Sequence, residues 1–75
     1  YQNKRKKKMK TRILEALQAK YFGEIKEAQA NIEIYLENPV GIGEHPEILD
    51  AIDTQIAKLA EAQEKFEVLK EFTDG

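Results

Sequence analysis

The chain has 75 residues, of which 41% are hydrophobic and 35% are charged, so it forms one domain at most. Charges interrupt every apolar stretch, so we expect neither a membrane span nor a signal peptide. There is no cysteine, which excludes disulfides and thiolate metal sites. This composition predicts a cytoplasmic protein that has no membrane partner.

The net charge of −2 hides a strong asymmetry along the chain. Residues 1–12 carry seven basic residues and no acid, so residues 13–75 hold the other five basic residues and all 14 acids, a net −9. The seven are Lys4, Arg5, Lys6, Lys7, Lys8, Lys10 and Arg12. The sequence therefore predicts a basic N-terminal arm, residues 1–10, on an acidic body.

The origin of this arm stays open in the sequence. Met9, followed by Lys10 and Thr11, has the form of a native start, in which case residues 1–8 are not part of the working protein. Thr11 is also a candidate N-cap for the first helix. The arm could equally extend that helix backwards, although positive charge at a helix N-terminus is unfavourable.

A first amphipathic helix is predicted for residues 11–37. Its apolar residues recur at steps of three or four, and the face comprises Leu14, Leu17, Tyr21, Ile25, Ala28, Ile32, Tyr35 and Leu36. Gly23 lies inside this helix, where it could allow a close helix approach or a slight bend. Phe22 and Ile34 lie off the main face, either as a further contact surface or as scattered exposed residues.

A corner loop is predicted for residues 38–45. Pro39 ends the first helix at about Glu37, and Pro46 has its φ preset for the first position of the second helix. Gly41 and Gly43 allow a sharp reversal between the prolines. The sequence thus predicts a helical hairpin over residues 11–75.

A second helix is predicted for residues 46–72, with an unusually wide apolar face. Its seam comprises Ile48, Ile52, Leu59, Phe66 and Leu69. Leu49, Ile56, Ala60 and Gln63 broaden the seam on one side, and Ala62 broadens it on the other. This face is wider than a two-stranded seam requires.

We therefore expect an all-α, antiparallel two-helix hairpin that dimerises into a four-helix bundle. Two helices alone leave wide apolar stripes uncovered, and a core of this size rarely gives more than about 3–5 kcal/mol. A homodimer would cover the stripes. The expected oligomer core comprises Leu17, Tyr21, Ile25, Ile32, Ile52, Ile56, Leu59 and Phe66.

Chemistry has little support in the sequence. There is no serine, no cysteine nucleophile and no phosphate-binding glycine motif, so we expect no enzyme and no cofactor. His45 lies near Glu44, Glu47 and Asp50, but one histidine without cysteine makes a metal site at the corner a weak alternative. The arm has the charge to bind a phosphate backbone or an acidic partner without reading sequence.

One long motif spans the end of the first helix and the corner: Ala30-Asn31-Ile32-Glu33-Ile34-Tyr35-Leu36-Glu37-Asn38-Pro39-Val40-Gly41-Ile42-Gly43-Glu44-His45-Pro46. Two shorter motifs precede it, Ile13-Leu14-Glu15-Ala16-Leu17 and Ala19-Lys20-Tyr21. Together they resemble small proteins of marine tailed phages, including those of cyanobacteria. Ala51-Ile52-Asp53 and Glu67-Val68-Leu69-Lys70 fit the same pattern. The resemblance covers roughly Met9 to Phe72. It implies an accessory role in a phage-infected cell and assigns no catalytic or binding residues.

The sequence thus predicts a non-enzymatic interaction or assembly module. The runner-up hypothesis is a nucleic-acid-associated protein that uses the basic arm.

Overall fold

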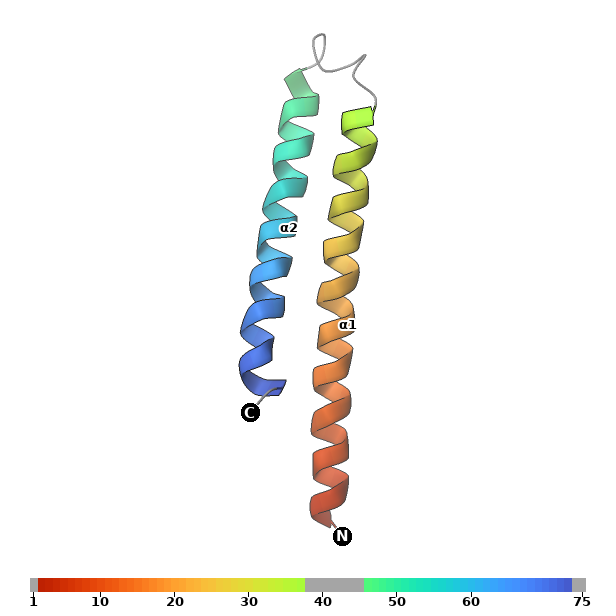
Figure 1. Ribbon diagram of the computed structural model, residues 1–75, viewed down its shortest axis with the longest axis vertical. Coiled ribbons are helices and arrows are strands. Elements are labelled where there is room, and N and C mark those ends of the chain that lie inside the picture. Colours follow the sequence, from red (N-terminus) through yellow and green to blue (C-terminus); the bar gives the residue numbers. More distant parts are fainter. Residues whose placement is uncertain (1, 38–45, 74–75) are drawn as a thin grey trace.

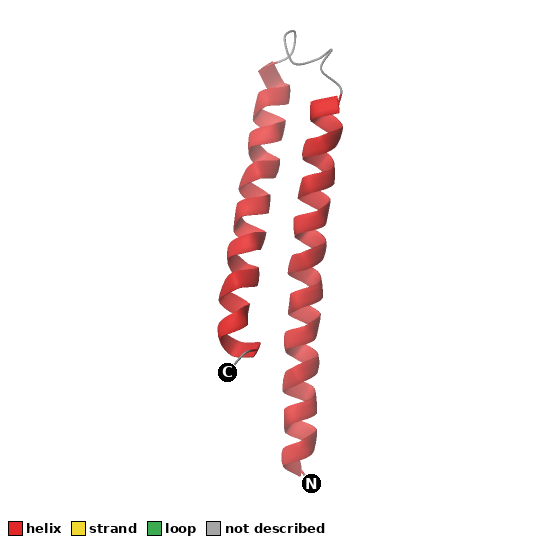
Figure 2. Ribbon diagram, viewed as in Figure 1, coloured by secondary structure: helices red, strands yellow, loops and turns green. Residues whose placement is uncertain are grey.

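The computed structural model describes residues 2–37 and 46–73, and these form two α-helices, α1 (Gln2–Glu37) and α2 (Pro46–Thr73) (Figure 2). The helices lie side by side and run in opposite directions (Figure 1), so the all-α hairpin is confirmed. The molecule is a rod of 63 × 16 × 14 Å. The predicted corner loop, with His45, lies outside the described residues.

The start of α1 corrects the sequence prediction. The helix begins at Gln2 rather than near Thr11, so Thr11 lies inside the helix and does not cap it. Glutamine, lysine and arginine are good helix formers, and the penalty for basic charge is confined to the first turn at about 0.3–1 kcal/mol. Propensity therefore outweighs the dipole, and α1 extends past the end of α2 (Figure 1).

The contact between the helices is centred on small side chains. Ala28 of α1 is 2% exposed and Ala62 of α2 is 3% exposed, while Leu69 is 7% exposed. We call the line of contact through Ala28 and Ala62 the alanine seam, or the seam. The small side chains of these two alanines let the helix backbones approach closely. Among the residues whose burial is described, these three are the whole buried apolar core, so the hairpin buries little on its own.

Two polar contacts between the helices report the same register. Asn31 Nδ2 donates to Gln55 Oε1 at 3.2 Å, and Lys65 Nζ lies 5.8 Å from the centre of the Tyr21 ring. The two contacts are ten residues apart on each helix, because Tyr21 precedes Asn31 by ten and Lys65 follows Gln55 by ten. The helices thus keep one alignment over nearly three turns.

Gly23 does not have the close-approach role that the sequence suggested. A Cβ built at Gly23 meets no atom within 4 Å, and no described residue has a positive φ. The position is open to solvent, and the glycine serves no packing purpose in the hairpin.

Candidate functional site

An uncharged stripe runs along each helix beside the seam, and together we call the two stripes the apolar face. It comprises Phe22, Ile25, Gln29, Ile32 and Leu36 of α1 with Leu49, Ile52, Ile56, Leu59, Gln63 and Phe66 of α2. The steps within each stripe are three or four residues, which keeps each stripe on one side of its helix. No charged residue interrupts either stripe.

The two stripes lie on the same face of the hairpin because the helices are antiparallel. Ile32 follows the seam residue Ala28 by four positions, and Phe66 follows the seam residue Ala62 by four. When two antiparallel helices face each other along their seams, residues that follow a seam residue by four positions lie on the same face of the pair. Residues that follow the seam by three, such as Asn31 and Lys65, lie on the opposite face.

Exposure within the apolar face rises with distance from the seam. Ile25, Ile32, Ile52, Leu59 and Phe66 are half-buried against the other helix. The outer members are open to solvent, with Phe22 52%, Leu36 57%, Leu49 60% and Ile56 50% exposed. A surface of this kind, apolar and continuous, is typical of a contact site for a partner.

Lysines border the apolar face without entering it. Lys26 Nζ lies 5.3 Å from the centre of the Phe22 ring, and Lys70 Nζ lies 5.6 Å from the centre of the Phe66 ring. Each lysine is four residues after its aromatic partner, so its stem covers part of the ring while its ammonium group stays in water. Lys70 Nζ also pairs with Glu67 Oε1 at 3.1 Å, so the border of the face is charged but not uniformly basic.

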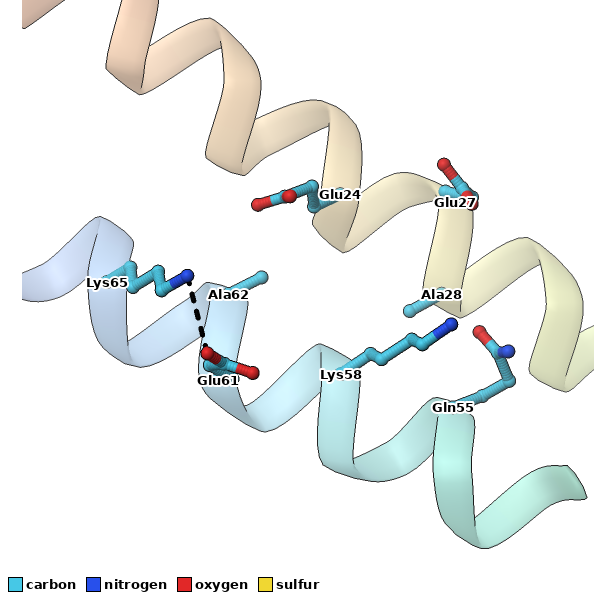
Figure 3. Close-up of a pocket in the computed structure, with 8 residues that line it drawn as sticks. All are labelled: Glu24, Glu27, Ala28, Gln55, Lys58, Glu61, Ala62 and Lys65. Atoms are coloured by element: carbon cyan, nitrogen blue, oxygen red, sulfur yellow. Dashed lines mark ion pairs between the residues drawn. The ribbon is translucent and has the colours of Figure 1, made fainter.

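The middle of the opposite face of the hairpin is polar. It holds a groove of about 260 Å³, and Figure 3 shows its lining residues, which come from both helices: Glu24, Glu27, Ala28, Gln55, Lys58, Glu61, Ala62 and Lys65. Lys65 Nζ pairs with Glu61 Oε1 at 3.3 Å. Carboxylates and ammonium groups alternate here, so this face is suited to water rather than to an apolar partner.

A second groove, of about 510 Å³, lies toward the open end of the hairpin. It is lined by Leu14, Leu17, Tyr21, Glu61, Glu64, Lys65, Val68, Leu69 and Phe72. Two of the predicted oligomer-core residues, Leu17 and Tyr21, lie in this groove and not on the apolar face. The other six belong to the apolar face, and among these six only Ile56 is exposed.

The predicted arm residues continue α1 as a basic helical segment. Lys10 and Arg12 are exposed, and for Lys4, Arg5, Lys6, Lys7 and Lys8 the structure describes the helical backbone alone. The segment projects beyond the C-terminal end of α2 (Figure 1). The helix therefore carries the arm's charge away from the packed part of the hairpin.

Metal-binding side chains do not cluster in the part of the chain that the structure describes. Residues 2–37 and 46–73 contain no group of three or more His, Cys, Asp or Glu side chains that could hold a metal ion. Neither described helix is long and apolar enough to cross a membrane.

The chain matches no protein-family model, no characterised protein sequence and no solved structure. The physical properties of the two faces are therefore the basis for a functional proposal.

Proposed function

We propose that the chain is a non-enzymatic assembly module, in which two hairpins pack through their apolar faces into a four-helix bundle. The observation that carries this proposal is the contrast between the two faces. One face is uncharged and exposes Phe22, Leu36, Leu49 and Ile56, while the middle of the other carries the alternating charges of the polar groove. Burial of the first face would remove apolar surface from water at little desolvation cost.

The accessible surface supports a partner of this size. The chain exposes 6276 Å², whereas a compact monomer of 8.6 kDa would expose about 4,700 Å² by the usual scaling with mass. The excess is about 1,600 Å² and includes the surface of the α1 segment that extends past α2, whereas each partner in a standard interface buries roughly 800 Å². A second hairpin on the apolar face would bring the surface toward that of a compact protein.

A pair of matched isoleucine variants tests the proposal. Ile56 lies on the apolar face and is 50% exposed, whereas Ile34 lies away from it and is 60% exposed. We expect Ile56→Glu to sediment as a monomer at micromolar concentration, because the glutamate would be buried unpaired in the dimer. Ile34→Glu should sediment as a dimer. Equal masses for the two variants would contradict the assignment of the interface.

We extend the proposal to the biological setting. Since the sequence resembles small proteins of marine tailed phages, the module would serve as an accessory protein in the cytoplasm of an infected cell. Loss of this gene from a phage that encodes it should then reduce phage yield without abolishing replication. A complete loss of replication would contradict an accessory role.

A second candidate function is binding of a nucleic-acid backbone by the N-terminal segment. The observation that favours it is the helical extension of α1, which carries the basic segment past the end of α2. Affinity for duplex DNA should fall steeply between 50 and 200 mM salt, by about 10³-fold or more if six phosphates are contacted. It should vanish when residues 1–8 are deleted, and binding that ignores salt would exclude this function.

A further inference from the structure

We infer that the second copy docks end for end, so that the corner end of each hairpin points toward the basic end of its partner. The inference rests on the proposed self-association and adds the orientation and chemistry of the partner. In the other possible arrangement, which we call same-end, both corners lie together at one end of the bundle. The distribution of charge along the hairpin distinguishes the two arrangements.

The corner end of the hairpin is acidic. Residues 27–57 contain seven carboxylates and no lysine or arginine. Among them, Glu33 and Glu37 are exposed at the end of α1, and Asp50 and Asp53 are exposed near the start of α2. These helix ends lie together at the corner (Figure 1). The corner end of the hairpin therefore carries a strong negative charge around the apolar face.

The other end of the hairpin is basic. Residues 2–12 carry seven lysines and arginines and no acid, and α1 takes them past the end of α2. The hairpin thus has opposite charges at its two ends, and these charges are separated along a rod that is 63 Å long. Each end would attract the other end of a second copy and repel its own kind.

The two arrangements differ at both ends of the bundle. A same-end dimer brings the two basic segments together and the two acidic corners together, so like charges oppose association twice. An end-for-end dimer separates the two basic segments from each other and the two acidic corners from each other. In the same-end dimer the end of α1 lies beside the start of the partner's α2, at the spacing of about 8–10 Å between bundle helices, which is close to the Debye length at physiological salt, so the corner carboxylates repel across the interface.

Helix dipoles do not distinguish the arrangements, because each hairpin is itself antiparallel and every neighbour in either bundle can be antiparallel too. Gln29, the polar member of the α1 stripe, does distinguish the two arrangements. Gln29 is half-buried in the middle of the apolar face. In an end-for-end dimer that pairs the two apolar faces, the middle of the α1 stripe meets the middle of the partner's α1 stripe, so the two Gln29 amides can bond to each other, as buried amides do at coiled-coil interfaces.

Distances between spin labels test this orientation, and the absence of native cysteine makes single-cysteine variants unambiguous. Thr11→Cys places a label near the basic end, and Ala57→Cys places one outside the middle of the apolar face. Both residues are exposed, and neither belongs to the apolar face. Pulsed electron paramagnetic resonance then measures the distance between the label on one copy and the label on the other.

Thr11 lies about 18 residues from Gln29, the middle of the α1 stripe. In the end-for-end dimer the two Thr11 labels are on opposite sides of this middle, so they should be roughly 50 Å apart. In the same-end dimer they are at the same end, so they should be roughly 30 Å apart or less. Labels at Ala57 should be within roughly 40 Å in both. A short Thr11 distance with a short Ala57 distance overturns the orientation but keeps the self-association. No distance between copies from Ala57 labels overturns the proposed function, and the orientation with it.

Discussion

Asn31 and Gln55 join the two helices through an amide–amide hydrogen bond, in which Asn31 Nδ2 donates to Gln55 Oε1 at 3.2 Å. The pair is partly buried beside the alanine seam. A partly buried polar pair adds little net stability, but it penalises any register that separates its members. The bond therefore specifies how α1 and α2 align.

A double-mutant cycle measures this coupling. We expect Asn31→Ala and Gln55→Ala each to lower the free energy of unfolding, and the double variant to lose less than their sum by about 0.5–1.5 kcal/mol. Urea unfolding followed by circular dichroism gives the four values. Strict additivity of the two losses would show that the amides do not interact in solution.

The alanine seam gives a second prediction. Ala28 is 2% exposed against α2, so Ala28→Leu should push the helices apart and lower the free energy of unfolding by about 1–3 kcal/mol. Ala30→Leu is the matched control, because Ala30 is exposed on the same helix. The control should change stability by less than about 0.5 kcal/mol. Equal effects of the two leucines on the urea midpoint would argue against close packing at Ala28.

A third prediction concerns Gly23, where a substitution should raise the free energy of unfolding instead of lowering it. Its site is open and its φ is negative, so Gly23→Ala should raise the free energy of unfolding by about 0.5–1 kcal/mol through helix propensity alone. Ala19→Gly, at an exposed site one turn earlier, should lower it by a similar amount. A destabilised Gly23→Ala protein in thermal or urea unfolding would reveal a contact that the hairpin does not contain.

Much of the hairpin follows from the sequence, because local rules and tertiary packing agree. Pro39 predicts an end near Glu37, where α1 ends, and α2 begins at Pro46 as predicted. The predicted end of α2 at Phe72 differs by one residue, since Thr73 is still helical and its Oγ1 donates to the carbonyl oxygen of Lys70 at 3.3 Å. Strong stop and start signals at both sides of the corner made these boundaries predictable.

Neighbouring apolar residues limited the prediction of the buried face. Tyr35 and Leu36 were both assigned to it, but consecutive residues point about 100° apart on a helix. Tyr35 is half-buried, whereas Leu36 is 57% exposed and belongs to the outer edge of the apolar face. Periodicity identifies a wide stripe and does not show which part of it an adjacent helix covers.

The same limit applies to α2. The sequence placed Ala62 at one edge of its wide stripe and Ile56 at the other, with no means of choosing the side that meets α1. The structure packs the Ala62 side, at 3% exposure, and leaves Ile56 half exposed. Two alanines allow a closer helix approach than isoleucine does, and only the paired helices reveal this preference.

The start of α1 was unpredictable for a different reason. Helix propensity of the basic segment and the dipole penalty at its first turn oppose each other with similar small energies. The sequence therefore left the segment either as an arm or as part of the helix, and the structure selects the helix from Gln2.

Self-association through the apolar face is the central claim, and solution mass tests it most directly. Sedimentation equilibrium at micromolar concentration should give twice the chain mass of 8.6 kDa, both for the chain from Tyr1 and for one that starts at Met9. Two dimers would show that the helices, and not the basic segment, hold the copies together. A monomeric mass for both would contradict the account and leave the apolar face to a different partner.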